Sequence, residues 1–359
     1  MGERIISADS HVRITHEAVK EHLPASMHAS YDRAVDKIGG GGVATRPGQN
    51  ELPAWLDGVR HAIGREGNHD PKARLADMDV DGVDVEVLYC EFSAFRYLYL
   101  IEGGWKEATR AFNDTLLAFE SADPDRLVVS YQIPLHDLDV AVNEVHRVAA
   151  QGGKSLQLPV HPVELGLPDY HDRVYDRLWA AVQETGLPVC LHIGLAPIKV
   201  YDDPQPAHAQ GVVQPLAAMW TSVQYGNFIL SGIFERFPRL KVVFVEPGVG
   251  WVPWWLNSVD RKVRDIGYSF PDITELPSFY FNRNVWLTFI DEKFAVHDLR
   301  HDIGVENMMW STDYPHPACT WPDSKAVIEK QFADIPAEER RLMLSGNAEK
   351  VWNLQPSGA

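Results

Sequence analysis

The feature that most constrains the fold of this chain is a regular alternation of short apolar runs with longer amphipathic segments beyond residue 70. The apolar runs lack a clean apolar–polar alternation, which is typical of strands buried on both faces of a parallel sheet. About eight such runs are separated by segments with helical periodicity, and this number favours a TIM-type (β/α)8 barrel over a doubly wound sheet. We therefore predict an α/β fold of the barrel type.

The expected strands are residues 4–8, 85–89, 127–133, 155–159, 188–192, 241–245, 285–288 and 308–311. The expected helices are residues 71–80, 105–122, 139–150, 170–185, 215–234, 251–264, 294–303, 336–345 and 348–351. One barrel of about 250 residues plus insertions accounts for the whole chain, 1–359, as a single domain. Residues 12–70 have an irregular pattern that includes four consecutive glycines at 39–42. We predict that this segment is an insertion after the first strand that forms a lid or small cap over the barrel mouth, because loops of this length are usually functional.

Composition and charge exclude several classes of partner. The chain is 45% hydrophobic and 23% charged, which is ordinary for a soluble globular protein. Its net charge of −17 argues against nucleic acid, because phosphate binding needs a basic face. No run approaches the 18 or so apolar residues of a membrane span, and no signal peptide is evident. Three widely spaced cysteines make a disulfide framework improbable, so a cytoplasmic protein acting on a small molecule is expected.

Acidic residues and histidines stand where several predicted strands end, which is where a barrel carries its chemistry. Asp9 and His11 end the first strand, and they share one side because strand residues two apart point the same way. His161 follows the fourth strand, His192 the fifth, Glu246 the sixth and Asp313 the eighth. Together, Asp9, His11, His192 and Asp313 would meet at the barrel axis. Such a mixed nitrogen and oxygen set suits Zn²⁺, or Mn²⁺ if carboxylates and water dominate.

Each of these residues also has a purely structural interpretation. A single histidine is more often structural than a ligand, and residues 9–11 alone could form a capping turn. Asp313 before Tyr-Pro suits a turn, and acidic residues at strand ends can cap the helices that follow. The coincidence of four such residues at one end of the barrel favours the metal site over these separate explanations.

Five segments spread over nearly the whole chain carry a family resemblance: ISADSH at 6–11, RLADMD at 74–79 before GVD at 82–84, LPVCLH at 187–192, GIFERFPRLK at 232–241 and STDYPH at 311–316. With them the chain resembles the amidohydrolase-related family of the amidohydrolase superfamily. Within it, the chain is similar to aminocarboxymuconate-semialdehyde decarboxylase and the resorcylate-type decarboxylases. The resemblance implies a single divalent metal, bound by Asp9, His11, His192 and Asp313. Relatives carry His or Glu at the position of Asp9, which remains a competent ligand.

The chain departs from this resemblance at the end of the sixth strand, where many relatives carry a catalytic histidine and this chain has Glu246. The carboxylate could be a general base, an extra ligand or a group that binds a substrate hydroxyl or ammonium. It could also be a carboxylate in a salt bridge at the barrel rim. The reaction type depends on this residue more than on any other.

Two reactions fit the site, with Asp313, Glu246 and His192 as the expected catalytic residues. In a lyase, which is closer to the resemblance, a small aromatic or unsaturated acid loses CO₂ and Asp313 protonates the ring carbon. In a hydrolase, Asp313 takes the proton of a metal-activated water, which attacks a carbonyl group so that an amide, an ester or a C–C bond is hydrolysed. A hydratase, or a barrel without catalysis, is a further alternative.

The substrate pocket is less strongly marked. His161, His316 and Trp251 are candidate wall residues, and Arg96 after the second strand could meet an anionic group. Trp251, Trp254 and Trp255 follow the sixth strand at close spacing, and such aromatic faces often pair subunits, so we expect a homodimer.

Overall fold

The computed structural model describes residues 3–37, 64–90, 98–101, 103–194, 200–201 and 208–355. Arg96 and the four glycines at 39–42 lie outside these ranges, so their predicted roles are not tested by the structure. Within the described ranges, each helix is too short or too polar to cross a membrane.

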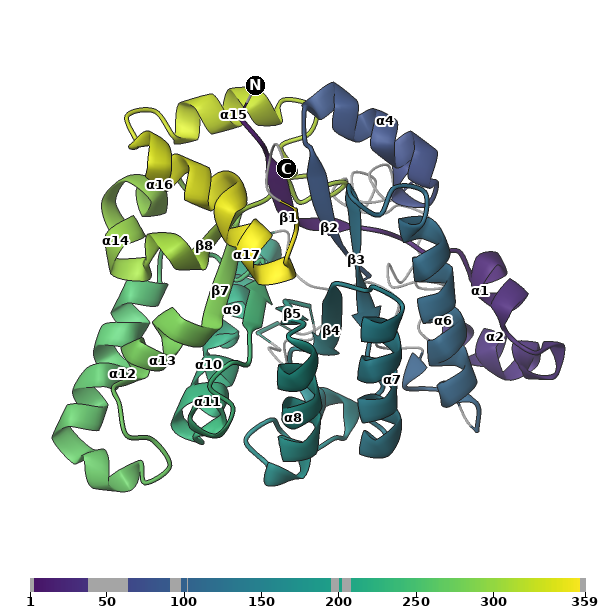
Figure 1. Ribbon diagram of the computed structural model, residues 1–359, viewed down its shortest axis with the longest axis horizontal. Coiled ribbons are helices and arrows are strands. Elements are labelled where there is room, and N and C mark those ends of the chain that lie inside the picture. The colour runs from purple at the N-terminus through teal and green to yellow at the C-terminus, as the bar shows by residue number, and fades with distance from the viewer. Residues whose placement is uncertain are drawn as a thin grey trace.

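Eight parallel strands form a nearly closed barrel with helices between them, as predicted (Figure 1). The strands are β1 (Ile6–His11), β2 (Val85–Tyr89), β3 (Leu127–Gln132), β4 (Ser155–Pro159), β5 (Val189–His192), β6 (Val242–Val245), β7 (Val285–Phe289) and β8 (Met308–Trp310). The helices are α1 (His16–His22), α2 (His28–Lys37), α4 (Pro71–Asp81), α6 (Trp105–Glu120), α7 (Leu138–Ala150), α8 (Asp176–Thr185), α9 (Ala209–Trp220), α10 (Ser222–Leu230), α11 (Ile233–Arg236), α12 (Val252–Ile266), α13 (Pro277–Asn284), α14 (Arg300–Ile303), α15 (Ser324–Gln331), α16 (Ala337–Arg341) and α17 (Asn347–Trp352).

The barrel closes where the end of β1 meets the segment that follows β8. The amide of Asp313 donates to the carbonyl of Asp9 at 3.1 Å, and the amide of His11 donates to the carbonyl of Tyr314 at 2.6 Å. Ser10 and Tyr314 form an isolated parallel bridge at the same place. Residues about 300 positions apart in the chain therefore share one edge of the barrel mouth.

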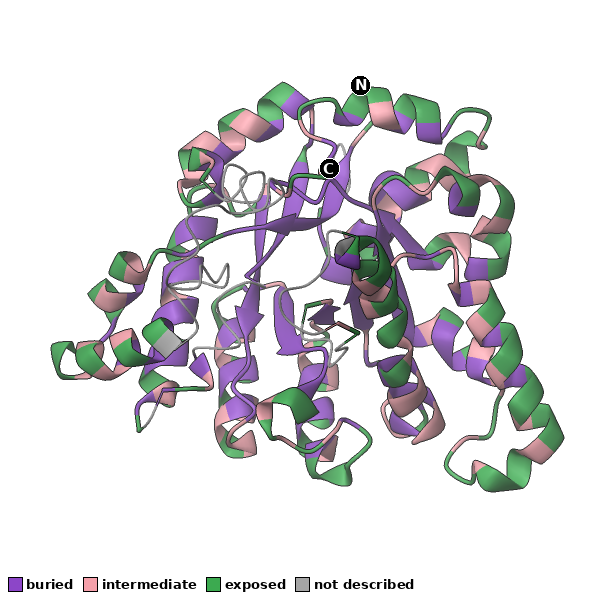
Figure 2. Ribbon diagram, turned by 180° about the vertical axis from the view of Figure 1, so that it is seen from behind, coloured by how far each residue is buried: buried purple, intermediate pink, exposed green. Residues whose placement is uncertain are grey.

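The strands are buried along their whole length, whereas the surrounding helices are exposed on their outer faces (Figure 2). Alternate strand residues such as Val129 and Leu156 pack outward against the helices in the main core. Residues such as Val87 and Cys190 belong to a second cluster that fills the barrel, as expected for strands with two buried faces.

Helix α17 covers the end of the barrel where the strands begin. The indole of Trp352 is buried and donates to Ser155, the first residue of β4, at 3.1 Å. Three buried asparagines stabilise the same end, since Asn284, Asn307 and Asn347 each donate from their side-chain amide to two backbone carbonyls. This end is therefore closed by packing and hydrogen bonds, which leaves the other end for chemistry.

The predicted strands agree with the observed ones to within about three residues at each end, but the helices differ more. Residues 16–37 contain two helices, α1 and α2, where we expected an irregular segment, and α1 packs beside α6 outside the barrel (Figure 1). The predicted single helix 215–234 is wrong. Helix α9 begins earlier, at Ala209, the helix is interrupted at Thr221, and Gly232 has a left-handed φ of 70° that separates α10 from α11. Pro215 lies inside α9 although proline favours the first helical turn. Helices α13 and α15 were not predicted.

We expect Asn347→Ala to lower the free energy of unfolding by about 1–3 kcal/mol, because two buried carbonyls lose their donor. The side-chain amide of Asn347 donates to Met308 at 2.7 Å and to Val305 at 2.8 Å. Urea titration with an unchanged m-value measures the loss. Asn257→Ala, at an exposed position of α12, is the matched control and should change stability by less than about 0.5 kcal/mol. Equal effects at the two positions would contradict the proposed role of Asn347.

Candidate metal centre

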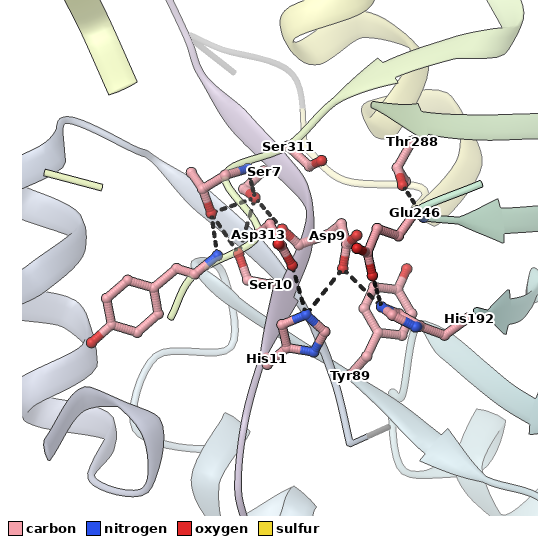
Figure 3. A network of polar contacts seen from close by, with 12 residues as sticks. Ser7, Asp9, Ser10, His11, Tyr89, His192, Glu246, Thr288, Ser311 and Asp313 are labelled. Carbon is pink, nitrogen blue, oxygen red and sulfur yellow. Dashed lines mark hydrogen bonds and ion pairs between the residues drawn. The ribbon is translucent and has the colours of Figure 1, made fainter. Parts of the chain in front are cut away.

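Asp9, His11, His192 and Asp313, the four predicted ligands, lie together at the barrel mouth and are all buried (Figure 3). The Nε2 atom of His11 lies 2.9 Å from Oδ1 of Asp313 and 3.9 Å from Oδ1 of Asp9. The Nε2 atom of His192 lies 3.5 Å from the same Asp9 oxygen. Asp9 thus occupies the middle of the group, between the two imidazoles.

The side chain of His192 is oriented by its own backbone. Its Nδ1 atom lies 2.6 Å from the carbonyl oxygen of Ile193, which can only accept a hydrogen bond, so Nδ1 carries the proton. The lone pair of Nε2 is therefore directed toward Asp9. Histidines that bind metals commonly have this arrangement, because a hydrogen bond from the second nitrogen fixes the tautomer and the ring orientation.

Asp9 provides the test of whether these residues fit a cation. It is fully buried, and neither of its carboxylate oxygens accepts a hydrogen bond from any residue that the structure describes. Burial of a carboxylate without hydrogen bonds is strongly unfavourable unless a cation compensates for the lost hydration. Two imidazoles and two carboxylates around such an atom fit a divalent metal ion.

A cluster of hydroxyl groups shapes the end of β1. The pairing of β1 with β2 is irregular between Ser7 and Ser10, and the Ser7 hydroxyl lies 2.7 Å from the carbonyl of Asp9, to which it donates. Thr312 donates its amide to the Ser7 hydroxyl at 2.9 Å, and its own hydroxyl lies 3.0 Å from that of Ser10. Ser10 thus faces the hydroxyl cluster, while Asp9 and His11 face the centre (Figure 3). Irregular pairing of this kind commonly re-aims side chains next to active sites.

Two acidic residues of the centre have unusual backbone conformations. Asp313 has a φ of 61° and Glu246 a φ of 58°, in the left-handed region that residues with a Cβ rarely adopt. Such strain costs about 1–3 kcal/mol for each residue and is concentrated at functional sites. For Glu246, a hydrogen bond from its amide to the Thr288 hydroxyl at 2.8 Å holds the conformation.

Glu246 and His316 also border the predicted ligands. Oε2 of Glu246 lies 3.8 Å from Nε2 of His192, and the His316 ring lies 4.3 Å from that of His11 between centroids. These residues form three overlapping groups, and within each group one donor atom per residue lies within 4.8 Å of the other two. The groups are Asp9, His11 and His192; His11, Asp313 and His316; and Asp9, Glu246 and Asp313.

The remaining predicted wall residues have different surroundings. His161 is buried after β4, and burial lowers the pKa of its imidazole to about 4 in spite of the opposing charge of Asp169. The indole of Trp251 donates to the carbonyl of Pro247 at 2.9 Å and stacks on Tyr225. Trp251 thus has a packing role in the structure, and contact of either residue with a substrate stays a prediction.

Sequence reasoning missed two buried glutamines near the mouth, Gln132 at the end of β3 and Gln157 in β4. The side-chain amide of Gln132 donates to Oε1 of Gln157 at 2.7 Å. The same oxygen accepts a hydrogen bond from the backbone amide of Cys90 at 3.2 Å. Oε1 of Gln132 and Nε2 of Gln157 have no hydrogen-bond partner in the described part of the chain. The strand-end rule that identified His192 would also have identified these residues, had polar residues without charge been considered.

Arg74 and Glu86 form a buried ion pair behind the centre, which was also missed. Nη1 of Arg74 donates to the carbonyl of His11 at 2.7 Å, and the guanidinium lies 4.2 Å from the centroid of the Tyr314 ring. The Tyr314 hydroxyl in turn bonds Asp77. Helix α4, which carries Arg74 and Asp77, therefore positions both halves of the β1–β8 junction. The motif at 74–79 pointed to these residues, but only the structure shows what they contact.

We expect Arg74→Met to destabilise the protein by about 3–5 kcal/mol, because it leaves the Glu86 carboxylate buried without its cation. Burial already raises the pKa of that carboxyl, against the opposing charge of Arg74. Chemical denaturation measures the loss. The double variant Arg74→Met/Glu86→Leu should regain part of the stability, since it removes the unpaired charge. A double variant that is less stable than Arg74→Met would refute the importance of the pairing.

The pKa of about 4 for His161 predicts an imidazole that is neutral at pH 7 and stays neutral as the pH falls through 6.5, the ordinary value. It would therefore contact a substrate as a hydrogen-bonding group without charge. The ring proton resonances of His161, assigned with His161→Gln, should titrate near pH 4. Titration of His161 near 6.5 would contradict the prediction.

Comparison with known proteins adds to this geometry. A family model described as Amidohydrolase matches residues 8–354. The gamma-resorcylate decarboxylase of Polaromonas sp. is 24% identical over 306 residues, which cover 79% of this chain and 87% of that protein.

Solved structures show the same fold. The 5-carboxyvanillate decarboxylase of Sphingomonas paucimobilis has a TM-score of 0.74 at 24% identity, covering 99% of this chain and 100% of that one. The 5-carboxyvanillate decarboxylase of Novosphingobium aromaticivorans, complexed with manganese and 4-hydroxy-3-methoxy-5-nitrobenzoic acid, has a TM-score of 0.72 at 19% identity, covering 98% and 97%. The match over residues 8–354 establishes that this chain belongs to the amidohydrolase family, as the sequence resemblance predicted.

Proposed function

We propose that this protein is a metal-dependent decarboxylase of a small aromatic or unsaturated carboxylic acid. The observation that carries the proposal is the buried group of Asp9, His11, His192 and Asp313, in which the Asp9 oxygens accept no hydrogen bond from the described residues. The decarboxylases among its relatives support the choice of reaction.

The four residues would hold one divalent ion, which would supply positive charge to bind the substrate carboxylate and a neighbouring oxygen. Local positive charge is needed here because the chain as a whole carries a net charge of −17. The four side chains are buried, and the low exposure to water would strengthen the electrostatic interactions in the site.

Asp313 is the group that we assign to proton transfer. Its carboxyl takes up a proton from water before each turnover and delivers it to the ring carbon that bears the carboxylate, and the bond between that carbon and the carboxylate then breaks. The bonding electrons stay with the ring, and CO₂ leaves. The left-handed backbone of Asp313 and the contact of its Oδ1 with His11 at 2.9 Å fix the carboxyl at the mouth of the barrel.

Neutral polar groups form the rest of the proposed pocket. Gln132 and Gln157 offer an acceptor and a donor that the described residues leave unused, which suits a substrate hydroxyl. His161, held neutral by burial, offers a further hydrogen bond. These groups would orient the ring without adding charge.

One observation favours hydrolysis as a second candidate. Asp9, Glu246 and Asp313 place three carboxylates close together, and their charge exceeds by one what a divalent cation neutralises. Such a centre repels an anionic substrate more than one with a histidine at the position of Glu246. In a hydrolase, Glu246 or Asp313 would take a proton from the attacking water, and the substrate would be an uncharged ester or amide.

We expect Asp313→Asn to lower the rate of decarboxylation by about 10²- to 10⁴-fold, because asparagine cannot deliver the proton. The assay measures CO₂ release by manganese-loaded protein from hydroxylated benzoic acids, including gamma-resorcylate and 5-carboxyvanillate. Metal content is measured in parallel, since asparagine keeps one ligand oxygen. Asp265→Asn, on the exposed face of α12, should retain the full rate.

An Asp313→Asn protein that turns over at the wild-type rate would eliminate the assigned role of Asp313. If the wild-type protein releases no CO₂ from these acids but hydrolyses esters or amides in a metal-dependent manner, the decarboxylase proposal fails and the hydrolase replaces it.

A further inference from the structure

We infer that Glu246 is itself a ligand of the metal ion, so that the centre offers three carboxylates and two imidazoles and prefers Mn²⁺ to Zn²⁺. The inference rests on the proposed metal-dependent function. It assigns the role of metal ligand to Glu246, which stands where many relatives carry a histidine. It excludes two other roles, a base remote from the metal and a salt bridge at the rim.

The backbone around Glu246 is held so that its side chain points into the centre. The residue follows β6 directly, and the hydrogen bond from its amide to the Thr288 hydroxyl, at 2.8 Å, maintains the left-handed φ of 58°. Three residues further on, the amides of Val249 and Gly250 donate to the Glu292 carboxylate at 3.0–3.1 Å and 3.1 Å. Thr288 in β7 and Glu292, three residues after β7, thus hold both ends of the turn that carries Glu246.

The distances around the Glu246 carboxylate are close to those expected between ligands of one ion. Oε2 lies 3.8 Å from Nε2 of His192, and one oxygen each from Asp9, Glu246 and Asp313 lie within 4.8 Å of one another. Nitrogen and oxygen ligands lie about 2.0–2.2 Å from their metal, so two of them are up to about 4.4 Å apart. Small side-chain movements would bring all three carboxylates to the same ion. Figure 3 shows the Glu246 carboxylate directed toward His192, next to Asp9.

Asp9 gives independent evidence that a cation belongs among these carboxylates. It is fully buried, and its two oxygens accept no hydrogen bond from the residues described by the structure. Bringing a third carboxylate toward this atom would increase the repulsion if the site held no cation. The strained backbone at Glu246 keeps the third carboxylate there, which is understandable if the carboxylate binds the same ion as Asp9.

The number and type of donors decide which metal is preferred. Zinc favours four ligands in a tetrahedral arrangement, with nitrogen and sulfur prominent among them. Manganese accepts more ligands and suits carboxylate and water oxygens. Asp9, Glu246 and Asp313 with His11 and His192 provide five donor groups, of which three are carboxylates, and His316 adds an imidazole within reach of His11 and Asp313. A substrate oxygen or water could then complete an octahedral set.

The test is a metal titration of the full-length protein after removal of bound metal by a chelator. Mn²⁺ and Zn²⁺ affinities are measured by chelator competition for the wild type and for Glu246→Gln. We expect Glu246→Gln to weaken Mn²⁺ binding by about 10- to 100-fold, at least as much as loss of an outer-shell partner, and to weaken Zn²⁺ binding less. Electron spin resonance of bound Mn²⁺ in ¹⁷O-labelled water should show one additional water ligand in the variant.

Asp291→Asn is the matched control, because it removes one charge from an exposed position near Glu292 at the same end of β7. It should change both affinities by less than about twofold, consistent with screening of exposed charges. Glu246→His is the second variant, and it should shift the preference toward Zn²⁺ because it exchanges a carboxylate for an imidazole. Thermal unfolding of the metal-free proteins confirms that each variant is folded.

Unchanged Mn²⁺ affinity and water number in Glu246→Gln would overturn the inference. So would an equal loss of affinity in Asp291→Asn, which would show that the effect is one of charge at a distance. Failure of the proposed reaction can be told apart from failure of this inference. If the protein binds Mn²⁺ through Glu246 but decarboxylates no acid, the assignment of Glu246 as a ligand still holds. A wild-type protein that takes up neither metal refutes the inference together with the metal-dependent function.

Discussion

The pairing of the end of β1 with the segment after β8 is the interaction on which the candidate site depends. Two backbone hydrogen bonds, from Asp313 to Asp9 and from His11 to Tyr314, join the first and last parts of the barrel. They bring Asp9 and His11 next to Asp313, although about 300 residues separate them in the chain. The buried Arg74–Glu86 pair and the hydroxyls of Ser7, Ser10 and Thr312 support this junction from outside the centre. The candidate ligands are thus held by barrel closure itself and by buried polar groups around it.

The centre holds its side chains rigidly and buries carboxylates close to one another. Its acidic residues are buried or half-buried, two of them on a strained backbone, and the Asp9 carboxylate has no hydrogen-bond donor among the described residues. A protein without a cation at this place would keep this arrangement at a considerable cost in stability. With a divalent ion, the same features place charge and donor atoms where a small substrate could react. The proposed metal binding would therefore explain the strain and the burial together.

Glu246 connects the metal to the choice of reaction. As a ligand it would leave Asp313 as the main group for proton transfer, while making the centre more negative than one with a histidine at this position. A substrate carboxylate could bind there only with help from neutral hydrogen-bond donors such as Gln157 and His161, both of which are buried at the mouth. The identity of the residue after β6 would thus affect the metal, the charge of the centre and the class of substrate together.

The sequence by itself determined the barrel, because about eight short apolar runs alternate with amphipathic segments of helical periodicity. It also located the predicted ligands, because parallel strands of a barrel all end on one side and the residues that end them must meet there. Helix α4 was equally predictable, with Asp70 as the N-cap, Pro71 in the first turn and Gly82 at the end. The division of residues 209–236 into α9, α10 and α11 was not, since the same apolar pattern suits one long helix or three shorter ones.

Only the tertiary structure decided what each side chain at the mouth contacts. The tautomer of His192 depends on its hydrogen bond to Ile193, and the direction of Glu246 depends on Thr288, more than forty residues away. Gln132 and Gln157 became candidates only when their burial and free amide atoms were known. The sequence determined which residues reach the barrel mouth, since that follows from strand order. Their distances, burial and hydrogen bonds arise from contacts between distant segments, which no local pattern encodes.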